Sequence, residues 1–145
     1  MEQHNKTVSE IRKFNRFYTV NMGFLDSEYL NTQYSIAETR ILFEIKRHGT
    51  CVQSDIVKTL HIDKSYLSRL MSRFYKNELI KKEKSGEDKR TTCIALTKKG
   101  LSETERLINA ANRQILEKIQ DLNSEECNEL CNALNTVISI LGKKE

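Results

Sequence analysis

One short basic segment holds the residues best suited to chemistry, and that chemistry is contact with the phosphates and base edges of nucleic acid. From Leu67 onward, apolar residues recur at i, i+3, i+4 and i+7, which predicts a helix with one buried face. The other positions of residues 64–76 carry hydroxyls, aromatic rings and cations but no carboxylate. An ordinary solvated helix face, the alternative, usually mixes both signs of charge. The candidate DNA contacts on this helix are Ser65, Tyr66, Ser68, Arg69, Ser72 and Arg73.

The residues before this helix predict the first half of a helix-turn-helix. Asp63 is a good N-cap for the basic helix, because its carboxylate can accept a free backbone N–H of the first turn. A shorter amphipathic helix is expected before it, with Thr50 and Gln53 as its capping box. His61 and Ile62 then form a turn of the expected length. Three polar residues of the shorter helix are candidates for contacts to the DNA backbone: Gln53, Ser54 and Lys58.

A charged β-hairpin is expected after the basic helix. A first strand opens at Ile80 and runs to Lys84, and residues 91–96 have the β-branched and alternating pattern of a second strand, with a turn-rich polar tip between the two. Lys89 and Arg90 in this tip could enter a minor groove, where the negative potential attracts cations. Asp88 could hold Arg90 in place by a charge-assisted hydrogen bond. The alternative is a solvated hairpin.

These motifs resemble the MarR family of bacterial transcriptional regulators. Residues 54–60 and 65–70 resemble the helix-turn-helix of that family, and three further motifs resemble the wing that follows it. The wing motifs are Asp88-x-Arg90, Ile94-x-Leu96-Thr97 and Lys99-Gly100. The resemblance implies an obligate homodimer with two winged helix-turn-helix lobes and a helical dimerisation domain. It also implies that a small ligand could bind between the two parts, as in many members.

The rest of the chain predicts further helices. Ser35 and Glu38 form a capping box for a helix that ends near His48, with Gly49 as its C-cap. Long helices are expected at about residues 4–21 and 98–119. A last helix follows with Ser124 as its cap, and its apolar residues recur at a/d spacing over two heptads. Two heptads are too short for a free coiled coil but suffice for packing against a second copy.

The expected fold is therefore mainly α with a small β-hairpin wing. We expect one domain over residues 1–145, with dimerisation helices at about 4–21 and 98–142 and the winged helix-turn-helix at about 35–97. The net charge of +4 is uneven, because residues 46–99 hold 14 Lys and Arg against 6 Asp and Glu. The remainder holds 10 against 14. Positive charge thus gathers on the predicted DNA-binding unit. No apolar run approaches a membrane span, and a cytoplasmic protein is expected.

The cysteines and acidic residues do not form a recognisable reaction centre. The four cysteines include no C-x-x-C pair, which disfavours a zinc site. Cys127 and Cys131 fit an apolar helix face, with an intersubunit disulfide or redox switch as the alternative. Cys51 would be a reactive thiol only if exposed. Neither a nucleophile–base arrangement nor a phosphate-binding glycine loop is present, so we expect no enzyme, no cofactor and no bound metal.

The sequence-based hypothesis is a homodimeric regulator, a repressor, that reads an inverted repeat in double-stranded DNA with half-sites about 10 bp apart. A cleft between the N-terminal helix, the helix of residues 35–48 and the long helix would bind a small effector that relieves repression. Its suggested lining is Phe14, Phe17, Tyr18 and Arg40, although the aromatic residues could equally be core. The alternatives are a redox-responsive regulator, a non-specific architectural DNA-binding protein and a winged helix that binds protein.

Overall fold

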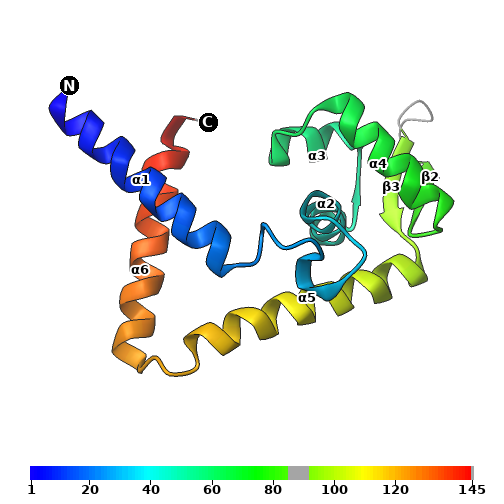
Figure 1. The fold of residues 1–145 in the computed structure, drawn as a ribbon. Coiled ribbons are helices and arrows are strands. Elements are labelled where there is room, and N and C mark those ends of the chain that lie inside the picture. Colours follow the sequence, from blue (N-terminus) through cyan, green and yellow to red (C-terminus); the bar gives the residue numbers. More distant parts are fainter. Residues whose placement is uncertain (85–91, 145) are drawn as a thin grey trace. The chain divides into compact units, whose positions relative to one another are not determined.

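The computed structural model describes residues 1–84 and 92–144 of the chain (Figure 1). It divides the chain into two compact units, Met1–Ala111 and Asn112–Glu145. The predicted fold class is confirmed, because the structure is mainly helical with a small antiparallel sheet. No helix among the described residues is long and apolar enough to cross a membrane.

The first unit contains most of the elements. Helix α1 is followed by a single 3₁₀ turn, and α2, α3 and α4 come next with the short strand β1 between α2 and α3. Strands β2 and β3 follow, and α5 begins directly after β3. The bounds are α1 Glu2–Asn21, the 3₁₀ turn Tyr29–Asn31, α2 Ile36–His48, β1 Thr50–Cys51, α3 Gln53–Leu60, α4 Lys64–Lys76, β2 Ile80–Lys84, β3 Thr92–Leu96 and α5 Lys98–Ile119.

The sheet has three strands in the order β1-β3-β2, all antiparallel. Ile80 pairs with Leu96 at one end of the hairpin, and Lys84 pairs with Thr92 at the other. The strands of the predicted hairpin are thus confirmed over 80–84 and 92–96. Strand β1 was not predicted, and the capping box at Thr50 and Gln53 is wrong. Thr50 lies in β1, and the Asp55 carboxylate instead accepts the Val52 N–H at 3.1 Å.

The core of the first unit lies between α2, α4 and the sheet. Ile41, Leu42 and Ile45 of α2 are fully buried against the apolar side of α4, as the helical spacing predicts. Both predicted features that bound α2 are confirmed. Ser35 and Glu38 accept each other's backbone N–H at 3.1 and 3.2 Å, and Gly49 ends the helix with a φ of 77°. Such a left-handed φ favours glycine.

The second unit consists of the end of α5, helix α6 at Ser124–Leu141 and a 3₁₀ turn at Gly142–Lys144. The predicted cap at Ser124 is wrong by one position. Asn123 Oδ1 accepts the Glu126 N–H at 2.8 Å, and a Glu126 carboxylate oxygen accepts the Asn123 N–H at 3.0 Å. No residue of α6 is buried within the chain, and Val137, for example, is 48% exposed. An apolar stripe of α6 is therefore open to solvent.

Candidate nucleic-acid interface

Helix α4 is held in one rotation about its axis by its apolar stripe. Leu67, Leu70, Met71 and Phe74 are all buried, and every polar residue predicted to contact DNA on this helix is exposed. At about 100° per residue, Ser65, Arg69 and Ser72 lie on the side opposite the buried stripe. The amphipathic pattern therefore determines which side chains of α4 face solvent.

The first turn of α4 is capped as the sequence predicts. Asp63 Oδ2 accepts the Tyr66 N–H at 2.8 Å, and His61 in the preceding turn has a left-handed φ of 49°. The cap satisfies one of the free backbone donors at the start of the helix. It also fixes the backbone of the turn that carries Ser65 and Tyr66.

One flank of α4 contacts α3. Gln53 Nε2 donates to Ser68 Oγ at 2.8 Å, so the structure brings together two predicted contacts from different helices. Ser54 and Lys58 are exposed on α3. The Ser72 hydroxyl donates back to the Ser68 carbonyl at 3.0 Å. These bonds limit the movement of the hydroxyl side chains on this flank.

The other flank of α4 faces α2. The Arg73 guanidinium lies 3.8 Å from Glu38 Oε1, and the Glu38 side chain is only 8% exposed. The Arg69 guanidinium lies over the Tyr66 ring, 5.6 Å from its centroid. Arg69 has no acidic partner among the described residues. Among the described residues, Arg69 therefore has no ion pair, whereas Arg73 forms one with the Glu38 carboxylate.

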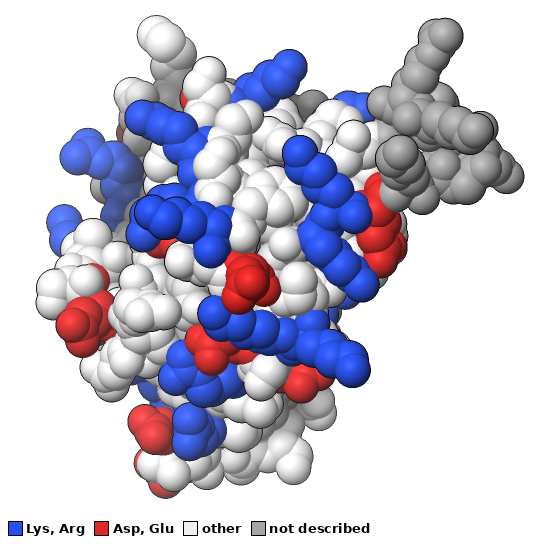
Figure 2. Space-filling model, turned by 90° about the vertical axis from the view of Figure 1, so that its right-hand side faces the viewer, with Lys and Arg blue, Asp and Glu red and all other residues white. Residues whose placement is uncertain are grey.

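The face of the molecule that carries α4 is rich in cations. Figure 2 shows Lys and Arg side chains across much of this face, with single carboxylates between them. Lys81 and Lys82 of β2 are exposed beside α4, and the Lys82 ammonium lies 5.3 Å from the centroid of the Tyr75 ring. A surface of this kind attracts phosphates over a distance of about a Debye length. The predicted wing residues Asp88, Lys89 and Arg90, together with Thr91, lie outside the described residues.

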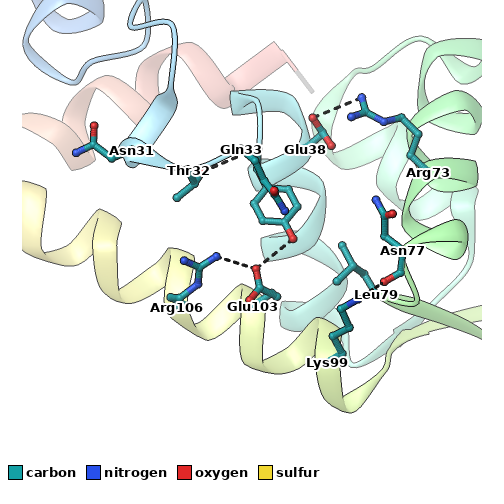
Figure 3. Close-up of a pocket in the computed structure, with 11 residues that line it drawn as sticks. Asn31, Thr32, Gln33, Glu38, Arg73, Asn77, Leu79, Lys99, Glu103 and Arg106 are labelled. Carbon is teal, nitrogen blue, oxygen red and sulfur yellow. Dashed lines mark hydrogen bonds and ion pairs between the residues drawn. The ribbon is translucent and has the colours of Figure 1, made fainter.

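A polar cavity of about 630 Å³ lies beside the C-terminal half of α4 (Figure 3). Its walls come from the segment before α2, from α2 itself, from the end of α4 and from the start of α5. The lining residues are Asn31, Thr32, Gln33, Tyr34, Glu38, Arg73, Asn77, Leu79, Lys99, Glu103 and Arg106. Sequence reasoning did not find this cavity, because its residues come from separate segments and share no spacing.

Hydrogen bonds inside the cavity fix the positions of its charged side chains. Glu103 accepts from Arg106 at 2.8 Å and from the Tyr34 hydroxyl at 3.2 Å. The Arg106 hydrogen bond is the main reason that the pKa of Glu103 is lowered, and the Tyr34 hydrogen bond adds to it. Burial is the main reason that the pKa of Tyr34 is raised. Glu103 is thus held as a carboxylate at neutral pH.

The residues suggested for an effector site form a different group. The Phe14 and Tyr18 rings stack with centroids 5.4 Å apart, and Tyr18 contacts Phe24, over which Arg40 lies at 5.8 Å. Phe17 is 61% exposed. None of Phe14, Phe17, Tyr18 and Arg40 belongs to the described lining of the polar cavity. Their role in ligand binding stays a prediction.

The cysteines differ in how far they are exposed. Cys51 is buried, and burial is the main reason that its thiol pKa is raised, so the condition for a reactive Cys51 is not met. Cys127 is half-buried and Cys131 is exposed on α6. Within residues 1–84 and 92–144, no group of three or more His, Cys, Asp or Glu could hold a metal ion.

Comparisons with known proteins show which proteins have a similar sequence or fold. The model of the MarR family matches residues 34–92. An HTH-type transcriptional regulator of Bacillus subtilis, YfiV, is 25% identical over 121 residues, which are 82% of this chain and 76% of that protein. A mutant of MarR from E. coli, complexed with operator DNA, has a TM-score of 0.72 at 18% identity and covers 92% of this chain and 96% of its own.

A second structure, of BpsR from Bordetella bronchiseptica, concerns the regulation of DNA binding by 6-hydroxynicotinic acid. Its TM-score is 0.68 at 19% identity, over 90% of this chain and 98% of that one. At these identities the structures show the shared fold, and the family model identifies the segment from Tyr34 to the second wing strand. Residues 34–92 of this chain thus match the MarR family of transcription regulators, and the chain shares the fold of the structures named above.

Proposed function

We propose that the protein is a homodimeric, sequence-specific repressor that binds an inverted repeat in double-stranded DNA. One observation carries the proposal: the solvent-facing side of α4 holds hydroxyls and cations but no carboxylate, on a helix whose rotation is fixed by its buried stripe. A helix of this size fits the major groove, where such side chains bind phosphates and base edges. As a DNA-binding regulator, the protein would act in the cytoplasm.

Uncovered apolar surface supports the homodimer. The sequence predicts that the helices at 4–21 and 98–142 dimerise, and neither α1 nor α6 has a buried residue within the chain. Leu130 and Leu134 of α6 and Phe14 of α1 are each more than 40% exposed. Stripes of this kind are usually covered by another chain. Two copies would place two α4 helices about one helical turn of DNA apart, ~34 Å.

The polar cavity supports control by a small ligand. Arg73, Lys99 and Arg106 face the carboxylates of Glu38 and Glu103 in this cavity, which leaves one net positive charge and favours a ligand with negative charge. The Arg73 side chain connects this cavity to α4. A ligand that bound better to the DNA-free state would lower the affinity for DNA by linkage. BpsR, whose DNA binding is regulated by 6-hydroxynicotinic acid, shares this fold.

Redox control is the less favoured form of regulation. Cys51, the cysteine of β1 before the helix-turn-helix, is buried with a raised thiol pKa. The exposed Cys131 keeps an intersubunit disulfide open as the alternative. Band shifts on a non-reducing gel after oxidation would identify such a bond.

Selection from a random duplex library tests the main proposal. The enriched sequences are then compared with scrambled duplexes by fluorescence anisotropy at two salt concentrations. We expect an inverted repeat that is bound about 10³-fold or more tighter than scrambled DNA. Salt-sensitive binding without any enriched sequence would instead identify a non-specific architectural protein, and no binding at either salt would favour a winged helix that binds protein.

A further inference from the structure

Arg69 is an exposed arginine on the outward side of α4. It lies opposite the buried stripe of the helix, and no described carboxylate neutralises it. The other arginines that flank the core behave differently, because Arg73 pairs with Glu38 and Arg106 pairs with Glu103. An unpaired guanidinium at the centre of an exposed helix face has its five N–H donors free for a ligand. An aromatic ring lies beside this guanidinium.

That ring is Tyr66, whose backbone is fixed by a hydrogen bond and which also lines a cavity. The Tyr66 backbone N–H is bound by the Asp63 carboxylate at 2.8 Å, which fixes the turn. The side chain lines a second cavity with residues of the segment before α2 and of its first turn, Glu28, Ser35 and Ala37 among them. Only 37% of Tyr66 is exposed. Tyr66 is therefore partly covered at the edge of this cavity, and the Arg69 guanidinium lies over its ring.

We propose that Tyr66 is a positioning residue that orients the Arg69 guanidinium toward a guanine in the major groove, so that the pair determines specificity at one base of each half-site. The inference rests on the proposed function. It names guanine as the base that helix α4 would read. A guanidinium above an aromatic ring keeps the N–H groups at its edge free. Those N–H groups match O6 and N7 of guanine, which accept two parallel hydrogen bonds.

The Tyr66 ring would increase the affinity by limiting the rotamers of the Arg69 side chain before DNA binds. A free arginine side chain loses rotamer freedom when it binds, and a stacked one has already lost part of it. The 5.6 Å separation between the guanidinium carbon and the ring centroid is within the range of cation–π attraction. A phosphate contact from Arg69 would need no such orientation, because phosphates lie along the whole groove and carry no sequence information.

The test combines protein variants with altered bases. The wild-type operator is first found by library selection, and each of its guanines is then replaced by 7-deazaguanine, which lacks the N7 acceptor. Affinities are measured for the wild type, Arg69→Ala, Arg69→Lys, Tyr66→Phe and Tyr66→Leu. Tyr75→Leu is the matched control, since Tyr75 also carries a cation over its ring on the same helix but touches Lys82 instead of Arg69. Thermal unfolding of each variant reports whether it is folded.

We expect one guanine in each half-site at which 7-deazaguanine weakens binding by the wild type by about tenfold or more. Arg69→Ala should bind the normal operator more weakly and lose its sensitivity to that replacement. Tyr66→Leu should lose most of the sensitivity, Tyr66→Phe should keep it, and Tyr75→Leu should keep it. Arg69→Lys should lose part of it, because an ammonium cannot bind both acceptors as a planar fork.

Two results would overturn the inference and leave the proposed function intact. One is an Arg69→Ala variant that selects the wild-type sequence with the same sensitivity to 7-deazaguanine. The other is a Tyr66→Leu variant that is as sensitive as the wild type. If Arg69→Ala changes only the salt dependence, Arg69 contacts phosphate, which also contradicts the assignment. A wild type that enriches no sequence at all would overturn the proposed function, and this inference with it.

Discussion

Gly100 of α5 lies against the backbone carbonyl of Leu79, the residue before β2, so closely that no side chain fits between them. A Cβ at position 100 would collide with the Leu79 carbonyl oxygen and lie 2.8 Å from its carbon. The same carbonyl accepts the Thr97 N–H at 3.0 Å, and the Thr97 hydroxyl accepts the Gly100 N–H at 3.0 Å. The start of α5, which Thr97 caps, is therefore joined directly to the turn after α4.

Replacing Gly100 by alanine should destabilise the protein. The obstacle is backbone and not a flexible side chain, so α5 and the turn after α4 must separate to admit a methyl group. We expect the free energy of unfolding to fall by about 2 kcal/mol or more, measured by urea denaturation. Gly142→Ala is the control, because nothing lies within 4 Å of a Cβ there, and it should change stability by less than about 0.5 kcal/mol. Equal midpoints for the two variants would contradict this account.

Replacing Asp63 tests the cap of α4. Asp63→Ala removes the acceptor of the Tyr66 N–H, whereas Asp63→Asn removes the same charge but keeps an acceptor oxygen. We expect the alanine variant to be less stable by about 1 kcal/mol and the asparagine variant to remain close to the wild type in thermal unfolding. A similar loss in both variants would mean that the charge of Asp63 matters more than its hydrogen bond.

Local patterns in the sequence predicted the elements that local rules determine. The stripe from Leu67 to Phe74 defines the buried side of α4, and the Ser35–Glu38 box marks the start of α2. The capping-box pattern failed where neighbouring residues match it equally well. Thr50 matches the capping-box pattern as well as any residue there, but backbone pairing with Ala95 draws it into a strand. A strand of two residues has too little sequence to show a period.

The candidate site was only partly predictable for a related reason. Which residues of α4 face solvent follows from its helical period, and these include Arg69 and Ser72. The partner of each side chain does not follow, because it depends on how separate segments pack. The Glu38–Arg73 pair and the Glu103–Tyr34 hydrogen bond join distant parts of the chain. Arg73 was thus predicted as a DNA contact on equal terms with Arg69, although the structure pairs it with a carboxylate.

Stability should depend on pH through Glu103. Because its folded-state pKa is lowered, Glu103 contributes stability above its ordinary pKa of 4.5, and this contribution is lost as the pH falls through the lower folded value. Glu103→Gln should therefore lower stability at pH 7, by less than about 1 kcal/mol since the group is partly exposed. The difference from the wild type should shrink as the pH falls below 4.5 and should disappear once the pH is below the lowered folded-state pKa. Glu105→Gln, at an exposed neighbouring position, is the matched control in thermal unfolding.

Placing a charge on the apolar stripe of α6 should separate the proposed dimer. Leu134 is 43% exposed within the chain, and an aspartate there would leave a carboxylate without a partner in a covered interface. We expect Leu134→Asp to raise the dissociation constant of the dimer by roughly thirtyfold, the effect of about 2 kcal/mol at an interface residue. Light scattering over a dilution series measures it. Asn132→Asp adds the same charge to a polar position about 200° around the helix and should leave the dimer unchanged. A Leu134→Asp protein that stays dimeric at every dilution would show that this stripe is not the interface.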